Sequence, residues 1–156
     1  MPKRLRKGDF TVVSARVRRE KVVCYIVRDE KLLVFRHTEF SWEEVGIQVP
    51  AGSIQAGESP ADAALREACE ETGLTEFTVV RELGRDQFDV RPNRFETHRR
   101  HFFQLALHRT TPERWASQED HDGLAPPTKL ECFWIPLTAA HVLQSGQSAM
   151  IGRLFD

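Results

Sequence analysis

Three glutamates crowd one short stretch of the chain, where Glu67, Glu70 and Glu71 stand at i, i+3 and i+4. In a helix these spacings place the three side chains on one face. Like charges so spaced repel, and each pair costs about 0.2–0.5 kcal/mol in an exposed helix. Gly73 follows as a natural helix stop, so the carboxylates also lie at the negative end of the helix dipole, which disfavours them further. The spacing therefore predicts that a cation compensates the cluster.

The chemistry that suits such a cluster is phosphoryl chemistry assisted by a divalent metal. Glutamate oxygens are hard ligands that suit Mg²⁺ or Mn²⁺ better than zinc. Magnesium shares its coordination positions with phosphate oxygens, and a metal so placed polarises phosphate and orients a nucleophilic water. The alternative is an acidic helix face that is simply solvated, and three glutamates alone favour that alternative. The residues around the cluster change this balance.

The surrounding pattern resembles the Nudix box, a signature written GX5EX7REUXEEXGU, in which U is a bulky aliphatic residue. The signature spans 23 of the 156 residues, and all seven of its fixed positions match. The matching residues are Gly52, Glu58, Arg66, Glu67, Glu70, Glu71 and Gly73, with Leu74 at the last aliphatic position. Ala68 departs from the pattern only in being smaller than the usual aliphatic residue. On these residues the chain is identified as a member of the Nudix hydrolases, similar to MutT.

The resemblance implies a fold and a metal site. Members have the Nudix fold, an α/β/α sandwich with a mixed β-sheet and a loop–helix–loop catalytic motif. Glu67, Glu70 and Glu71 match the metal-binding carboxylates of the family. Glu67 also matches the general base of some members, and the carbonyl of Gly52 matches a backbone metal ligand. The implied cofactor is Mg²⁺, with Mn²⁺ as a second possibility.

The resemblance also implies a reaction. Glu58 and Arg66 match an ion pair that joins the loop to the catalytic helix. A magnesium-activated water would attack the diphosphate linkage of a nucleoside diphosphate joined to a group X, as in nucleoside triphosphates, ADP-ribose or nucleotide sugars. Two alternatives stay open, a non-catalytic nucleotide sensor with the same fold and a hydrolase of RNA 5′ ends. An intact signature speaks against the sensor, because degenerate boxes mark such proteins.

Candidate substrate contacts lie ahead of the signature. Phe40 and Trp42 either stack on a base or pack against other apolar side chains. Arg36 either meets a phosphate or is a solvated surface residue. Many family members add a carboxylate from outside the box. Five residues qualify here, each of which is otherwise a solvated charge: Glu96, Glu119, Asp120, Asp122 and Glu131.

The elements that must position these residues begin with a helix over 60–72. Ser59 is a good N-cap, Pro60 suits the first helical position and Gly73 suits the C-terminal stop. Runs of apolar and β-branched residues predict strands. We expect strands at 11–17, 21–28, 31–36, 77–83, 86–90, 95–109 and 130–135, an extended piece at 47–50, loops at 38–46 and 110–129, and helices at 138–144 and 147–155. The chain is thus expected to form one α/β domain over 1–156.

Composition limits the classes of partner. The chain has 22 lysines and arginines against 23 aspartates and glutamates, and this net charge of −1 excludes a broad basic surface for a long polyanion. No apolar run reaches the roughly 18 residues of a membrane helix, and no apolar signal segment is evident. Three dispersed cysteines fit a reducing compartment. We therefore expect a cytoplasmic protein with a small nucleotide substrate, no membrane or stable nucleic-acid partner, and a homodimer as an open possibility.

Overall fold

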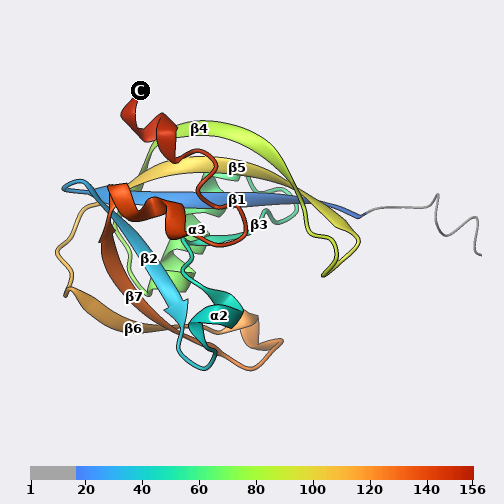
Figure 1. Cartoon of the computed structure of the whole chain (residues 1–156), viewed down its shortest axis with the longest axis horizontal. Coiled ribbons are helices and arrows are strands. Elements are labelled where there is room, and N and C mark those ends of the chain that lie inside the picture. Colours follow the sequence, from blue (N-terminus) through green and yellow to red (C-terminus); the bar gives the residue numbers. More distant parts are fainter. Residues whose placement is uncertain (1–16) are drawn as a thin grey trace, which may run out of the picture.

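Strand β1 (Val17–Arg28) lies at the centre of a seven-stranded mixed sheet (Figure 1). The fold is taken from a computed structural model that describes residues 17–156, without the side chain of Trp42. The other strands are β2 (Lys31–His37), β3 (Ala51–Ser53), β4 (Phe77–Asp89), β5 (Glu96–Leu107), β6 (Arg114–Glu119) and β7 (Thr128–Pro136). Their order is β4-β5-β1-β2-β7-β6, and β3 pairs with β1 beside this path. The mixed sheet confirms the predicted α/β class.

The pairing of β1 brings the signature loop to the middle of the sheet. β1 runs parallel to β5 along most of its length, but it pairs with β2 only at Val27 and Arg28. Its earlier residues are therefore free on that side, and β3 pairs there in antiparallel register, with Gly52 opposite Val22. This register fixes the backbone of Gly52 against the central strand of the sheet.

Helix α3 (Pro60–Thr72) confirms the helix predicted for 60–72. The Ser59 hydroxyl caps it by accepting a hydrogen bond from the Asp62 amide at 3.1 Å. Gly73 ends it with a left-handed φ of 71°, and the Gly73 amide donates to the Cys69 carbonyl. The face turned to the sheet carries small residues that let the helix approach closely, namely Ala63, Ala64 and Ala68.

Side chains of β1 alternate between two hydrophobic cores, one on each face of the sheet. Val22, Cys24 and Ile26 pack on the α3 face, whereas Val23 and Tyr25 pack on the opposite face. Two 3₁₀ helices cover that second face, η2 (Leu137–Val142) and η3 (Ile151–Phe155) (Figure 1). The sandwich layering is therefore present, but the helices predicted for 138–144 and 147–155 are shorter 3₁₀ turns. The positive φ angles at 145 and 146, of 54° and 67°, turn the chain between them.

Several other predicted boundaries need correction. The predicted loop at 110–129 contains strand β6 and the 3₁₀ turn η1 (His121–Gly123), because a polar edge strand lacks the apolar run that the prediction sought. The predicted loop at 38–46 contains the short helix α2 (Trp42–Val45). The extended pieces at 77–83 and 86–90 form the single strand β4. The strand predicted at 11–17 lies, apart from its last residue, outside the described residues. Among residues 17–156, no helix is long and apolar enough to cross a membrane.

Candidate active site

The guanidinium of Arg66 organises the carboxylates of the signature. It forms a two-point ion pair with Glu58, with Nε and Nη2 at 2.8 and 2.9 Å from the two carboxylate oxygens. The same Nη2 donates to the Ser53 carbonyl at 2.8 Å, which ties the helix to the end of β3. Nη1 donates to Glu67 at 2.9 Å and to Glu70 at 3.2 Å. One planar side chain thus fixes the loop, the helix and two of the clustered glutamates.

The backbone of β3 lies so close to the helix that only glycine fits at position 52. A Cβ built on Gly52 would stand 2.1 Å from Cδ of Glu67, far inside any real contact. The next glutamate inward, Glu71, accepts a hydrogen bond from the Ala51 amide at 2.9 Å. Both carboxylates are nearly closed off, with Glu67 6% and Glu71 5% exposed. The signature glycine therefore exists to let the strand backbone meet the glutamates directly.

Strand β6 adds a further carboxylate to those of α3. Oxygens of Glu67 and Glu70, on α3, and of Glu119, at the end of β6, all lie within 4.8 Å of one another. Strand β6 is held against α3 by its own side chains, since Trp115 Nε1 donates to the Thr72 carbonyl at 2.8 Å and Ser117 Oγ donates to a backbone carbonyl of the same helix. Strand β6, which the sequence analysis did not predict, thus brings the Glu119 carboxylate to the predicted site.

Burial disfavours the charged form of two glutamates at the site, Glu67 and Glu71. It raises the pKa of Glu67 to about 7, where hydrogen bonding from Arg66 works in the opposite direction and the charges of Glu70 and Glu119 add to the rise. Burial also raises the pKa of Glu71 well above its ordinary value. Carboxylates that resist ionisation in this way are stabilised by a cation, and a set of hard carboxylate oxygens suits a divalent ion such as Mg²⁺. The donor set therefore fits the metal that the sequence predicts.

The ion pair at the rim behaves differently. Hydrogen bonding from Arg66 lowers the pKa of Glu58, and Glu58 in turn raises the pKa of Arg66. Glu58, which is outside the carboxylate cluster, is therefore charged across the physiological range. The pair is a fastening between loop and helix, which is the role that the resemblance implies for it.

The cluster opens into a cavity of about 630 Å³. Its walls come from β1, β3, α3, the end of β6 and η1, and they include Glu67, Glu70, Glu119, Asp120 and Asp122. Two cations face this acidic wall, Arg66 and Lys21. Sequence reasoning missed Lys21, because a lysine inside an apolar strand has no distinguishing pattern. Only the pairing of β1 with β3, which sets Lys21 opposite Ser53, reveals its place.

The remaining predicted residues lie elsewhere. Arg36, on β2, pairs with Glu131 of β7 at 3.0 Å and lines neither this cavity nor the second one described below. Phe40 is 52% exposed and has the His37 ring as an edge-on neighbour. Glu96 lies on β5, where it contacts His98 at 3.0 Å. The stacking predicted for Trp42 concerns a side chain outside the described part of the structure. Substrate contact by Arg36 and Phe40 stays a prediction without geometric support.

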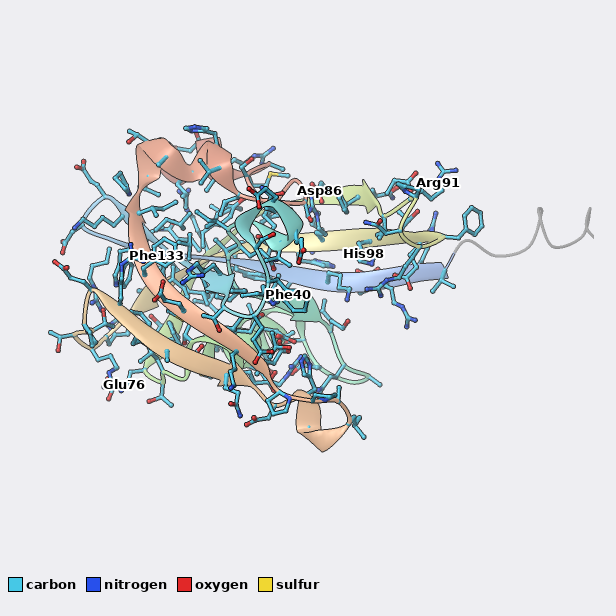
Figure 2. The ribbon with its side chains drawn as sticks, turned by 60° about the horizontal axis from the view of Figure 1, so that its bottom comes forward. Phe40, Glu76, Asp86, Arg91, His98 and Phe133 are labelled. Atoms are coloured by element: carbon cyan, nitrogen blue, oxygen red, sulfur yellow. The ribbon has the colours of Figure 1, made fainter. Side chains whose placement is uncertain are left out.

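A second, smaller cavity adjoins the first. It measures about 340 Å³ and shares three lining residues with the carboxylate cavity, Lys21, Ala51 and Gly52. The rest of its wall comes from β1, from the ends of β4 and β5 with the turn between them, and from the segment before η3. Figure 2 shows Asp86 on β4, His98 on β5 and Arg91 in the turn that joins the two strands. Neither Arg36 nor Phe40 lines this cavity.

Comparisons with known proteins agree with the fold and the signature. The family model described as "NUDIX domain" matches residues 17–153. A curated relative, the RNA pyrophosphohydrolase of Brucella abortus (strain 2308), is 31% identical over 105 residues, which cover 58% of this chain and 54% of that protein. The chain therefore spans about half the length of the curated relatives it matches.

Solved structures give the same answer at lower identity. A UDP-X diphosphatase superposes with a TM-score of 0.65 at 19% identity, over 97% of this chain and 70% of that one. A NUDIX hydrolase from Nitrosomonas europaea gives a TM-score of 0.65 at 19% identity, over 89% and 87% of the two chains. These similarities show a shared fold. With the family model matching nearly the whole described chain, this protein belongs to the NUDIX family.

Proposed function

We propose that this protein hydrolyses the diphosphate linkage of a nucleoside diphosphate joined to a group X. The observation that carries the proposal is the carboxylate cluster, in which Glu67, Glu70 and Glu119 bring their oxygens within 4.8 Å of one another at the wall of a cavity. Such a cluster has no stabilising role of its own, because like charges at this distance repel. Its cost is understandable if the cavity binds a cation together with a polyanionic substrate.

The proposed cofactor is Mg²⁺, with Mn²⁺ as the alternative that the same oxygen donors accept. Glu67, Glu70 and Glu119 would hold it together with the carbonyl of Gly52, and the ligand role that the signature assigns to Glu71 stays a prediction. When bound, the ion would neutralise charge on the diphosphate and lower the pKa of a coordinated water. Phosphoryl transfer depends mostly on such positioning and charge neutralisation.

The chain's own residues would supply positioning and proton transfer. Glu67 is the candidate general base, the role that the signature gives to this position in some members of the family. Its Oε atom would take the proton of the attacking water. Arg66 would hold Glu67 and Glu70 in place through its hydrogen bonds, and Glu58 would hold Arg66. Glu71, bonded to the Ala51 amide, would keep β3 and α3 in register.

Hydrolysis of RNA 5′ ends is a second candidate, favoured by the similarity to the Brucella RNA pyrophosphohydrolase. The non-catalytic nucleotide sensor is the third, and the complete carboxylate set argues against it. The cytoplasmic location and the homodimer remain predictions. These candidates differ in what they release and from which substrate, so one assay separates them.

The experiment follows product release from a substrate panel with Mg²⁺, with Mn²⁺ and with EDTA. The panel contains nucleoside triphosphates, ADP-ribose, nucleotide sugars, dinucleoside polyphosphates and a 5′-triphosphorylated RNA. The proposal expects metal-dependent release of a nucleoside monophosphate from small substrates. Equal rates in EDTA would contradict the metal's role, and tight binding without hydrolysis of any substrate would favour the sensor.

A matched pair of variants tests the carboxylate outside the signature. Glu119→Gln is expected to raise the metal concentration needed for half-maximal rate, because it removes one charged oxygen from the cluster. Glu113→Gln makes the same change at an exposed residue just before β6 that lines neither cavity. Identical metal dependence in the two variants would remove Glu119 from the site.

A further inference from the structure

The smaller cavity begins where the carboxylate cavity ends. The two share Lys21, Ala51 and Gly52 as a common border, so a ligand can extend from one into the other without crossing a wall. We propose that this second cavity seats the nucleoside of the substrate and selects bases that carry a carbonyl oxygen, guanine and uracil, over adenine and cytosine. The inference rests on the proposed function and deepens it by naming the substrate class.

Charge divides the two cavities sharply. Five carboxylates line the larger one, whereas no acidic residue is among the described lining residues of the smaller one. The smaller cavity has Arg94, His98 and Arg100 in its wall instead, besides the shared Lys21. Arg100 is paired with Asp86, and Arg94 and His98 contact Glu96, so the smaller cavity suits the uncharged nucleoside, while the phosphates nearest the acidic wall need a cation. The diphosphate would lie at the border, next to Lys21.

Lys21 is held ready at this border. Its Nζ lies 2.7 Å from Ser53 Oγ, a neutral partner, so none of its charge is neutralised by a hydrogen-bonded carboxylate. It stands opposite Ser53 in the β1–β3 pairing, on the strand next to Gly52. The ammonium is a compact point charge suited to phosphate oxygens. Lys21 is therefore placed to contact a diphosphate whose nucleoside lies in one cavity and whose leaving group lies in the other.

The smaller cavity also has an apolar part to its wall. The Phe88 ring lines it and has the Arg100 guanidinium 4.5 Å from its centroid. Val90, just after the end of β4, adds a second apolar side chain. A base that enters between this wall and β1 loses apolar surface to Phe88, which is the contact that aromatic side chains provide for nucleobases. A volume near 340 Å³ is at the lower end of the range in which small ligands bind.

Gln147 gives the cavity its selectivity. The Val49 amide can only donate, and it donates to Gln147 Oε1 at 2.9 Å, so the side-chain amide is oriented with its Nε2 as the remaining group. This Nε2 makes no hydrogen bond to any described residue. It is not fully enclosed by protein atoms, so a ligand or water can reach it. Gln147 therefore presents a committed donor to the cavity that it lines.

A committed donor discriminates between bases. Guanine and uracil carry a carbonyl oxygen at the position where adenine and cytosine carry an amino group. The Nε2 of Gln147 bonds the oxygen, whereas an amino group would face it donor to donor. The mismatch leaves both groups without partners in a poorly hydrated site, and this costs more than the loss of one good hydrogen bond.

The turn that carries Gln147 is fixed to the sheet before any ligand arrives. Arg100 pairs with Asp86 through two bonds of 2.8 and 2.6 Å and donates to the carbonyls of Ser145 and Gly146 at 2.7 and 3.2 Å. The Tyr25 hydroxyl donates to the carbonyl of Gln147 itself. These bonds hold the donor in one place, so selectivity would not depend on ordering the turn.

The test measures binding of GMP, UMP, AMP and CMP by calorimetry in EDTA, with the wild-type chain, Gln147→Glu and Gln87→Glu. In Gln147→Glu one carboxylate oxygen still accepts from the Val49 amide and the other becomes an acceptor. The control makes the same change at an exposed residue of β4 that lines neither of the two cavities. We expect the wild type and the control to bind GMP and UMP roughly tenfold more tightly than AMP and CMP, in line with one hydrogen bond.

Gln147→Glu should reverse that order and favour AMP and CMP. Equal affinities for the four nucleotides, an unchanged order in Gln147→Glu, or no binding of any of them would overturn this inference. Hydrolysis assays keep the two proposals apart. Metal-dependent turnover without base preference would leave the proposed function standing and remove the selectivity, whereas base-selective binding without turnover of any diphosphate would do the opposite.

Discussion

At the scale of single residues, the site contains two buried glutamates, Glu67 and Glu71, that the fold keeps from ionising freely. Burial raises the pKa of Glu67 to about 7, and it raises that of Glu71 as well. Both glutamates nevertheless pack against the backbone of β3, Glu67 beside Gly52 and Glu71 as the acceptor of the Ala51 amide. Ionising such a carboxylate is costly without a metal ion and favourable with one. The stability of the protein should therefore depend on pH and on cations.

The raised pKa of Glu67 has a stability consequence with a definite sign. The folded metal-free protein holds a proton on Glu67 up to about pH 7, whereas the unfolded chain releases it near the ordinary value of 4.5. Between these values the folded state binds more protons, so the contribution of Glu67 to stability is present below 4.5 and is lost as pH rises through 7. Urea unfolding in EDTA from pH 5 to 8 should show Glu67→Gln gaining stability relative to the wild type as pH rises.

Glu44→Gln is the control for that measurement, because Glu44 is exposed in α2 and lines neither cavity. Its difference from the wild type should stay flat over the same pH interval. A difference for Glu67→Gln that shrinks or stays constant from pH 5 to 8 would contradict the raised pKa. Saturating Mg²⁺ should reduce the pH dependence of the wild type, since the cation favours the ionised carboxylates.

Arg66 is the residue whose shape, in addition to its charge, the site requires. Lysine in its place keeps the charge but cannot make the two-point contact with Glu58 while also bonding Ser53 and Glu67. Arg66→Lys should cost about 2 kcal/mol of unfolding free energy in urea, the range of charge-assisted hydrogen bonds, and should slow hydrolysis. Arg85→Lys alters an exposed i,i+3 pair with Glu82 and should cost clearly less than Arg66→Lys, because exposed ion pairs contribute little. Equal losses in the two variants would refute the role given to Arg66.

At the scale of elements, the catalytic helix was predictable from local chemistry and the strand beside it was not. Helix α3 begins and ends where Ser59 and Gly73 indicate, since caps act within one turn of the chain. Strand β6 has exposed residues alternating with half-buried ones, but two of its half-buried residues, Ser117 and Glu119, are polar, so the sequence shows no apolar period. Its register against β7 decides which acidic residue reaches the site, and register is a tertiary property.

Glu119 shows the limit of sequence reasoning at this scale. It was one of five acidic candidates, and nothing in the composition of its segment separated it from Asp120 or Asp122. The structure separates them, because the last residue of β6 turns its carboxylate toward Glu67 and Glu70. The substrate contact predicted for Phe40 depends on tertiary structure in the same way. Phe40 belongs to a loop whose course depends on β2 and β7, and it lines neither cavity.

The N-cap of the catalytic helix offers a direct test of the local argument. Ser59→Ala removes the side-chain acceptor of the Asp62 amide and should lower the unfolding free energy by about 1 kcal/mol. Ser148→Ala, which removes a hydroxyl with no side-chain hydrogen bond to the described residues, should change it by much less. Urea unfolding of both variants is the measurement, and equal stability of the two would show that the cap contributes nothing.

At the scale of the whole molecule, the small net charge hides a division. Residues 52–74 contain five acidic residues and one basic residue, while the rest of the chain contains 18 acidic and 21 basic residues, so the net charge of −1 is a cancellation. The fold keeps this division in space, since one cavity has an acidic wall and its neighbour has basic residues with no carboxylate among the described lining residues. A phosphorylated ligand and a cation together complement both.

The sheet topology is what joins these two environments. β1 pairs with β3 on one side and with β5 on the other, so the strand that carries Lys21 borders both cavities. The layer of η2 and η3 then closes the second core and brings the turn with Gln147 to the rim (Figure 1). None of this arrangement follows from local patterns, because it requires residues more than a hundred positions apart to meet.

The most direct test of the central claim is the turnover number of Glu67→Gln with a nucleoside diphosphate substrate at saturating Mg²⁺, beside Glu44→Gln. If the carboxylate cluster performs the hydrolysis, release of nucleoside monophosphate should fall by about 10²–10⁴-fold in Glu67→Gln, as expected for loss of a general base, and should stay at the wild-type rate in the control. Turnover of Glu67→Gln equal to that of the wild type would contradict the account.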